Sequence, residues 1–259
     1  MPFLEHLEEL RWRILVSLVA LLVGAVVGFV LAMHFDVLSL LTRPVEPLLG
    51  DTKLKYLSPT DPFFLTLKLG LGIGALLVAP IILYQIWAFV TPALKPEERR
   101  AIVPALYLGL VLFVAGAALA YFLALPMTLR FMLGFQVESL EQNLIVGSYL
   151  SFVVKLLLGF GLIFEMPVVV LLLAYIGVVD SRMLAAKRRH AIVVIAILAS
   201  VVTPGDVVIL TAFLMVPLLL LYELSIMLAK MVERRRARRR EAEEEADAAT
   251  GPMPAAEVS

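Results

Sequence analysis

The sequence of 259 residues has no cysteine, only three histidines and few charged residues for its length. Without cysteine, the chain can form no disulfide bond, thiolate metal site or thiol nucleophile. The histidines lie too far apart in sequence to indicate a metal site (His6, His34 and His190). The sequence also lacks the phosphate-binding loop G-x-x-x-x-G-K-[ST] and the protease motifs H-E-x-x-H and G-x-S-x-G. We therefore expect no metal, no cofactor and no enzymatic activity.

The composition is that of a polytopic membrane protein. Hydrophobic residues make up 61% of the chain and charged residues only 17%, below the roughly 25% typical of soluble domains. The mean hydropathy is +0.97. The 22 basic and 22 acidic residues cancel in number, but they are segregated along the sequence. That segregation carries more information than the net charge of zero.

Apolar runs predict an all-α integral membrane protein with six transmembrane helices in residues 1–229. The predicted helices span 14–33, 61–90, 101–125, 149–179, 191–202 and about 208–229. Helices 5 and 6 form a short hairpin, because the twelve residues of 191–202 rise only about 18 Å against a hydrocarbon core of about 30 Å. Loops are expected at 34–60 and 126–148, and the charged tail 230–259 is expected to be disordered.

Three local features refine this prediction. Gly24 and Gly28 have the GxxxG spacing that permits close approach between helices. Ser148 is expected to cap the fourth helix. Tyr84, Gln85 and Trp87 give the far end of the second helix an interfacial character.

The distribution of lysine and arginine predicts that both termini are cytoplasmic. Sixteen of the 22 basic residues fall on the side of the two termini and four on the opposite side. The remaining two, Lys68 and Lys155, lie within predicted helices. Basic residues are enriched in cytoplasmic loops, so the side with sixteen is assigned to the cytoplasm.

One carboxylate, Glu165, lies within an otherwise apolar run, FGLIFEMPVVV at 160–170. A charge at the centre of a bilayer costs about 2.5 to 3.5 kcal/mol on insertion scales, so such a residue faces protein, water or a partner. Lys155 lies ten residues away, about 15 Å along a helix, and is too distant to pair with it. Water, a partner helix and an inserted peptide all remain candidates. A secondary transporter could use such a residue too, but its repeated pair of broken hydrophobic segments is absent from the sequence.

Acidic residues also occur in two places on the predicted cytoplasmic face. One group is Glu5, Glu8 and Glu9, and the other is Glu97 and Glu98. Acids in the first turn of a helix stabilise its dipole by about 0.3 to 1 kcal/mol, which is one explanation for them. A receptor for a cationic peptide is the other, because guanidinium groups pair strongly with carboxylates.

Several short motifs, in order over about residues 1–229, resemble the TatC family of twin-arginine translocase proteins, the Sec-independent protein translocases. They are FLEHLEELRWRI at 3–14, SPTDPFF at 58–64, APIILYQIWAFVTPAL at 79–94, EERR at 97–100, SYLSFV at 148–153, FGLIFEMPV at 160–168, KRRH at 187–190 and TPGD at 203–206. One departure is Gly205, where many members carry a second proline. The tail 230–259 matches only in its charge bias.

The resemblance implies a receptor for signal peptides with consecutive arginines. Such a receptor works in a multi-copy complex with small single-span partners of the TatA and TatB type, in the plasma (inner) membrane of a prokaryote. It exports folded proteins using the proton-motive force.

By motif position, the resemblance also implies roles for individual residues. Glu9 and Glu98 bind the twin arginines, while Arg11 and Phe89 shape that site. Pro44 belongs to a cap on the far side, Asp206 to the short hairpin, and Glu165 is the intramembrane polar site. Glu8 and Glu97 are interpreted as helix-end charges.

Overall fold

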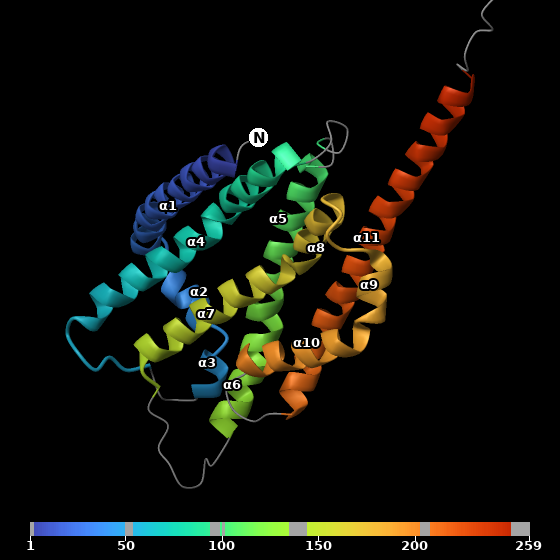
Figure 1. The fold of residues 1–259 in the computed structure, drawn as a ribbon. Helices are drawn as coiled ribbons and strands as arrows, with labels where there is room; N and C mark the ends of the chain where they lie inside the picture. The colour runs from blue at the N-terminus through green and yellow to red at the C-terminus, as the bar shows by residue number, and fades with distance from the viewer. Residues whose placement is uncertain are drawn as a thin grey trace, which may run out of the picture.

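The computed structural model describes residues 3–49, 54–93, 99, 102–134, 144–202 and 208–249. Regular structure in these residues is helical, apart from one isolated β-bridge between Lys55 and Ile145. The prediction of an all-α fold is therefore confirmed. The N-terminus and the C-terminal end of the last helix lie toward the same end of the molecule (Figure 1).

Among the described residues, five helical segments are long and apolar enough to cross a membrane. They are Glu5–His34 in α1 (Phe3–His34), Asp61–Val90 (α4), Ile102–Gly134 (α5, Ile102–Leu119; the π-helix η3, Ala120–Ala124; α6, Leu125–Gly134), Val146–Tyr175 (α7, Val146–Phe164; α8, Met166–Tyr175) and Leu214–Arg239 in α11 (Val208–Ala249). The shorter helices are α2 (Val37–Thr42), α3 (Glu46–Leu49), η1 (Thr91–Ala93), α9 (Ser181–Ala186) and α10 (Arg188–Val202).

The predicted fifth crossing corresponds to α10, which has only 15 residues. Its shortness agrees with the sequence, whereas a sixth crossing stays a prediction. The predicted sixth helix is not short, because α11 has 42 residues and continues through Lys230 to Ala249. The structure thus differs from the expected disordered tail over 230–249. Arginine, glutamate and alanine, which dominate this stretch, are all strong helix formers.

Two contacts tie this extension of α11 to the rest of the chain. The Glu233 carboxylate accepts hydrogen bonds from the backbone N–H and the hydroxyl of Ser181, both at 2.5 Å. The Arg236 guanidinium donates to the carbonyl oxygen of Tyr175. An acid therefore lies at the first residue of α9 and a base at the last residue of α8, which is the charge arrangement that helix dipoles favour.

The third long helix passes through Pro126 and ends at Gly134, so the predicted loop at 126–148 begins later than expected. Proline lacks an N–H and its ring clashes with the preceding turn, which usually ends a helix. Here the π-helical turn at Ala120–Ala124 precedes it, so the backbone is wider in the turn that the proline ring follows. Leu125, fully buried in the core, holds this segment in place.

The predicted fourth helix is divided into α7 and α8 at Glu165. Pro167 lies in the first turn of α8, where a helix needs no N–H from it. If α7 and α8 were one continuous helix, the missing N–H of this proline would interrupt the backbone hydrogen bonds. The segment begins at Val146 with Ile145 as its N-cap, so the prediction that Ser148 caps it is wrong. It ends at Tyr175, shortly before Gly177, whose φ of 78° is the left-handed conformation that follows many helices.

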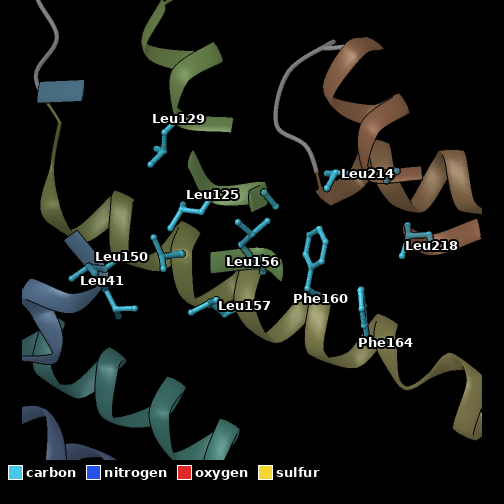
Figure 2. Close-up of a cluster of buried hydrophobic side chains, with 14 of the residues drawn as sticks. Leu41, Leu125, Leu129, Leu150, Leu156, Leu157, Phe160, Phe164, Leu214 and Leu218 are labelled. Atoms are coloured by element: carbon cyan, nitrogen blue, oxygen red, sulfur yellow. The ribbon is translucent and has the colours of Figure 1, made fainter. Parts of the chain in front are cut away.

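The core is built around α7. Its buried residues recur every three or four positions along one broad face, including Leu150, Leu157, Phe160 and Phe164. Figure 2 shows Phe160 and Phe164 on the side of Leu214 and Leu218 of α11, and Leu150 next to Leu41 of α2. A second cluster contains Trp87, which is 2% exposed, and Val168 of α8. Trp87 is therefore a core residue, and its predicted position at the level of the membrane interface stays a prediction.

Glycines bring α1 and α4 together along their length (Figure 1). A Cβ atom on Gly28 would lie 2.7 Å from the backbone nitrogen of Gly74. A Cβ on Gly24 would lie 2.9 Å from the carbonyl oxygen of Gly74, and one on Gly70 would lie 2.6 Å from Cα of Phe29. The GxxxG spacing of α1 thus meets a second one on α4, Gly70 and Gly74, and the two backbones touch because no side chain separates them.

Candidate functional site

One side of α1 carries the side chains that meet α4 near the N-terminus. The imidazole of His6 stacks on the ring of Phe89, with centroids 4.3 Å apart and planes at 18°. Arg13, seven residues later, donates from Nη1 to Oε1 of Gln85 at 3.3 Å. His6, Arg13, Gly24 and Gly28 therefore form the contact stripe of α1, and Glu9 lies beside it.

Glu9 is held by two neighbours on its own helix. Arg13 donates from Nε to Oε1 of Glu9 at 3.0 Å, and its Nη2 donates to the same oxygen. Oε2 of Glu9 lies 3.8 Å from Nδ1 of His6. The spacings of three and four residues put all three side chains on adjacent turns. His6 therefore lies between Phe89 and Glu9, and the three side chains are neighbours in one site.

Glu9 also lines a hollow of about 510 Å³ with other residues of α1: Glu5, Glu8, Arg11, Trp12 and Leu15. Three carboxylates with one guanidinium among them make a surface suited to a cationic ligand. Arg11, predicted from motif position, lies in this hollow. So does Glu8, which was expected to be a helix-end charge, although the structure places it on the same surface as Glu9.

On the other side of the Glu9–Arg13 ion pair lies an apolar groove between α1 and α4. Its volume is about 350 Å³, and its lining includes Arg13, Ser17, Gln85 and Phe89 among aliphatic side chains. The ion pair therefore stands between an acidic hollow and an apolar groove. An extended peptide with charged and apolar residues in succession could contact both.

Two predicted site residues, Glu98 and Asp206, lie outside the described residues. Pro44 is half-buried in the turn between α2 and α3. The hydroxyls of Tyr121 and Tyr149 donate to the carbonyl oxygens of Leu40 and Leu41, each at 2.6 Å, and so fix this turn to the helices of the core. Pro44 thus belongs to a small helical cap at the end of the molecule away from Glu9 (Figure 1).

Glu165 is 5% exposed and lies at the break between α7 and α8. Within the described part of the chain, neither of its carboxylate oxygens has a hydrogen-bond partner. Gly109 of α5 leaves space for the group, because a Cβ there would lie 3.0 Å from Oε2 of Glu165. The carboxylate thus faces the interior of the chain.

Sequence reasoning missed His6, Arg13, Gln85 and Gly109. The spacing of His6, Glu9 and Arg13 on one helix was a usable signal, because residues three and four apart are neighbours on a helix surface. Gln85 and Gly109 had no such signal, because each reaches its partner only through the packing of different helices.

Comparison with known proteins identifies the family. Residues 5–217 match the model of the family described as Sec-independent protein translocase protein (TatC). The TatC protein of Aquifex aeolicus is 41% identical over 234 residues, which cover 89% of this chain and 95% of that protein. The chain belongs to the TatC family.

Other TatC proteins agree with this assignment. The protein of Escherichia coli K12 is 34% identical over 232 residues, covering 88% of each chain. A crystal structure described as twin arginine translocase receptor TatC superposes with a TM-score of 0.74 at 39% identity, covering 88% of this chain and 99% of that one. The resemblance based on the motifs is therefore confirmed.

Membership of the TatC family makes the chain a multi-pass bacterial membrane protein of a protein transport family. The match to the family model begins at residue 5 in α1, includes α4 and the break at Glu165, and ends at residue 217. Glu233 and Arg236 therefore lie beyond the part that matches the model.

Proposed function

We propose that this chain is the membrane receptor and core subunit of a twin-arginine protein translocase. It binds signal peptides that carry two consecutive arginines and assembles with single-span TatA- and TatB-type proteins. The complex exports folded proteins at the expense of the proton-motive force. Family membership supports this proposal, as do the names of its relatives.

The observation that carries the proposal is the position of Glu9. The Glu9 side chain is about one-quarter exposed, lines the hollow that also contains Glu5 and Glu8, and lies next to the stacked rings of His6 and Phe89. A partly desolvated carboxylate forms stronger hydrogen bonds with a guanidinium than a fully hydrated one. The geometry therefore suits an arginine side chain, with Arg11 limiting the approach and Glu98 supplying the second carboxylate by motif position.

The experiment is site-specific crosslinking to a precursor with a twin-arginine signal, comparing Glu9→Ala, Glu98→Ala and the double variant with the natural chain. We expect crosslinks to be lost while the protein still inserts into the membrane. Glu46→Ala is the matched control, since Glu46 is an exposed acid in the cap away from the site. Unchanged crosslinking in the double variant would leave helix-dipole stabilisation as the role of these acids.

Glu165 is proposed as the later contact for a partner helix or for the inserted signal peptide. An acid without a hydrogen-bond partner in the described chain is costly in the membrane, so a donor from another molecule would lower the free energy. The carboxylate faces Gly109, and such a contact therefore requires its side chain to rotate away from α5.

The proposed orientation has both termini in the cytoplasm, supported by the lysine and arginine distribution and by the common end of α1 and α11 (Figure 1). The natural chain contains no cysteine, so a single introduced thiol is the only one. Leu57 is 75% exposed and lies in the loop predicted to be outside. We expect an impermeant maleimide added to intact cells to label the variant Leu57→Cys and to leave the variant Arg189→Cys unlabelled. The reverse pattern would invert the topology.

A further inference from the structure

The carboxylate of Glu9 already binds a guanidinium, that of Arg13. Two nitrogens of Arg13 donate to Oε1 of Glu9, one of them Nε at 3.0 Å. Its third nitrogen, Nη1, donates to Gln85 on α4 at 3.3 Å. The Arg13 side chain is 22% exposed and that of Glu9 is 26% exposed, so the pair is partly withdrawn from water. These are the contacts that an arriving arginine would need to make with Glu9.

The two partners of this ion pair line different hollows. Glu9 lines the acidic hollow of α1, whereas Arg13 lines the apolar groove between α1 and α4 together with Gln85 and Ser17. A ligand in the acidic hollow can thus reach Glu9 without entering the groove that Arg13 lines. The groove gives the Arg13 side chain space to move away, and Gln85 keeps a hydrogen bond to it.

We propose that Arg13 is a resident competitor, which occupies the Glu9 carboxylate in the free receptor and is displaced toward Gln85 when an arginine of the signal peptide binds. This inference rests on the proposed function of Glu9. Its consequence is a lower affinity than the same site would have without Arg13. A receptor that must later release its peptide gains from such a competitor, because release is assisted by the return of Arg13.

The expected effect is small and has a definite sign. When a peptide arginine replaces Arg13, its guanidinium can make the same hydrogen bonds to Glu9. The free-energy cost of displacing Arg13 is therefore that of breaking its partly exposed ion pair with Glu9. Such pairs contribute up to about 1 kcal/mol, so removing the competitor should tighten binding about two- to fivefold. If the ion pair served only to hold α1 against α4, its loss would weaken binding or leave it unchanged.

The test measures the dissociation constant of a synthetic peptide with two consecutive arginines for the full chain in lipid nanodiscs. We expect Arg13→Met to bind about two- to fivefold more tightly, and Arg13→Lys to lie between it and the natural chain because an ammonium lacks the planar fork. Unchanged or weaker binding in both variants would overturn the proposal. If Arg13→Met does not fold, the sign of the change in Arg13→Lys decides by itself.

A second comparison separates direct competition from a general effect of charge. In a Glu9→Gln background, Arg13→Met should no longer change the dissociation constant, because the two side chains act as a pair. A gain that persists in that background would show that Arg13 acts only through its positive field, and the proposal would fail. If Glu9→Gln alone leaves binding unchanged, the proposed function of Glu9 fails instead, and the two failures are distinguishable.

Discussion

Replacing Glu165 with leucine should stabilise the chain while impairing transport. The carboxylate is 5% exposed, and neither oxygen has a hydrogen-bond partner in the described residues. An unsatisfied buried polar group costs about 1 to 3 kcal/mol. Against this, an acid at the N-cap of α8 gains about 0.3 to 1 kcal/mol from the helix dipole, which leucine would lose.

The difference between these terms is a net stabilisation of about 1 to 2 kcal/mol for Glu165→Leu. Leucine is similar in volume, and the space beside Gly109 that now holds the carboxylate would hold its methyl groups. We expect a higher unfolding midpoint in a denaturant titration of the purified protein in detergent. Export of a folded reporter with a twin-arginine signal, and co-purification of TatA- and TatB-type partners, should both decrease.

Glu165→Gln is the matched variant, because it keeps the shape and a polar end. We expect its stability to remain near that of the natural chain and its partner co-purification to exceed that of Glu165→Leu. A loss of stability in Glu165→Leu would refute the reasoning, since it would mean that the carboxylate has a stabilising partner. Normal export in the same variant would refute the proposed role of Glu165 in transport.

Two further predictions concern packing. Gly28→Ala should destabilise the α1–α4 pair by about 1 to 3 kcal/mol, because the new Cβ would lie 2.7 Å from the backbone nitrogen of Gly74. Gly159→Ala is the control and should leave stability unchanged in the same unfolding assay, because a Cβ there would have no atom within 4 Å. Ending the chain after Val232 should lower the melting temperature, because Glu233 and Arg236 and their hydrogen bonds to the α8–α9 connection are removed. A chain ending after Arg240 keeps both residues and serves as the control, and equal melting temperatures for the two truncated chains would contradict this prediction.

Much of the helical framework could be predicted from local sequence. The bounds of α4 at Asp61 and Val90 agree with the sequence, because a polar loop and proline precede it and the apolar run ends there. Errors arose where a local signal was overridden. Pro126 predicts a helix end, but the π-helical turn before it lets the helix continue to Gly134. The charge of the stretch after Lys230 predicts disorder, but Glu233 and Arg236 fasten it to α9 and α8.

The candidate site was predicted only in part. Glu9, Arg11 and Phe89 followed from motif position, and the structure brings them to one end of α1 and α4. That Glu9 already has a guanidinium partner could have been suspected from the four-residue spacing to Arg13. That Arg13 also bonds to Gln85, 72 residues away, could not.

By itself, the sequence determined that the chain is an α-helical membrane protein and where most of its long helices run. In lipid each helix must satisfy its own backbone hydrogen bonds, so length and hydropathy suffice to place it. Only the tertiary structure decided which face of each helix meets which neighbour. The sequence of a helix that is apolar on every side carries little information about which face meets which neighbour. How the helices pack together therefore decides the burial of Trp87, the position of Glu165 beside Gly109 and that of Glu9 beside the acidic hollow and the apolar groove.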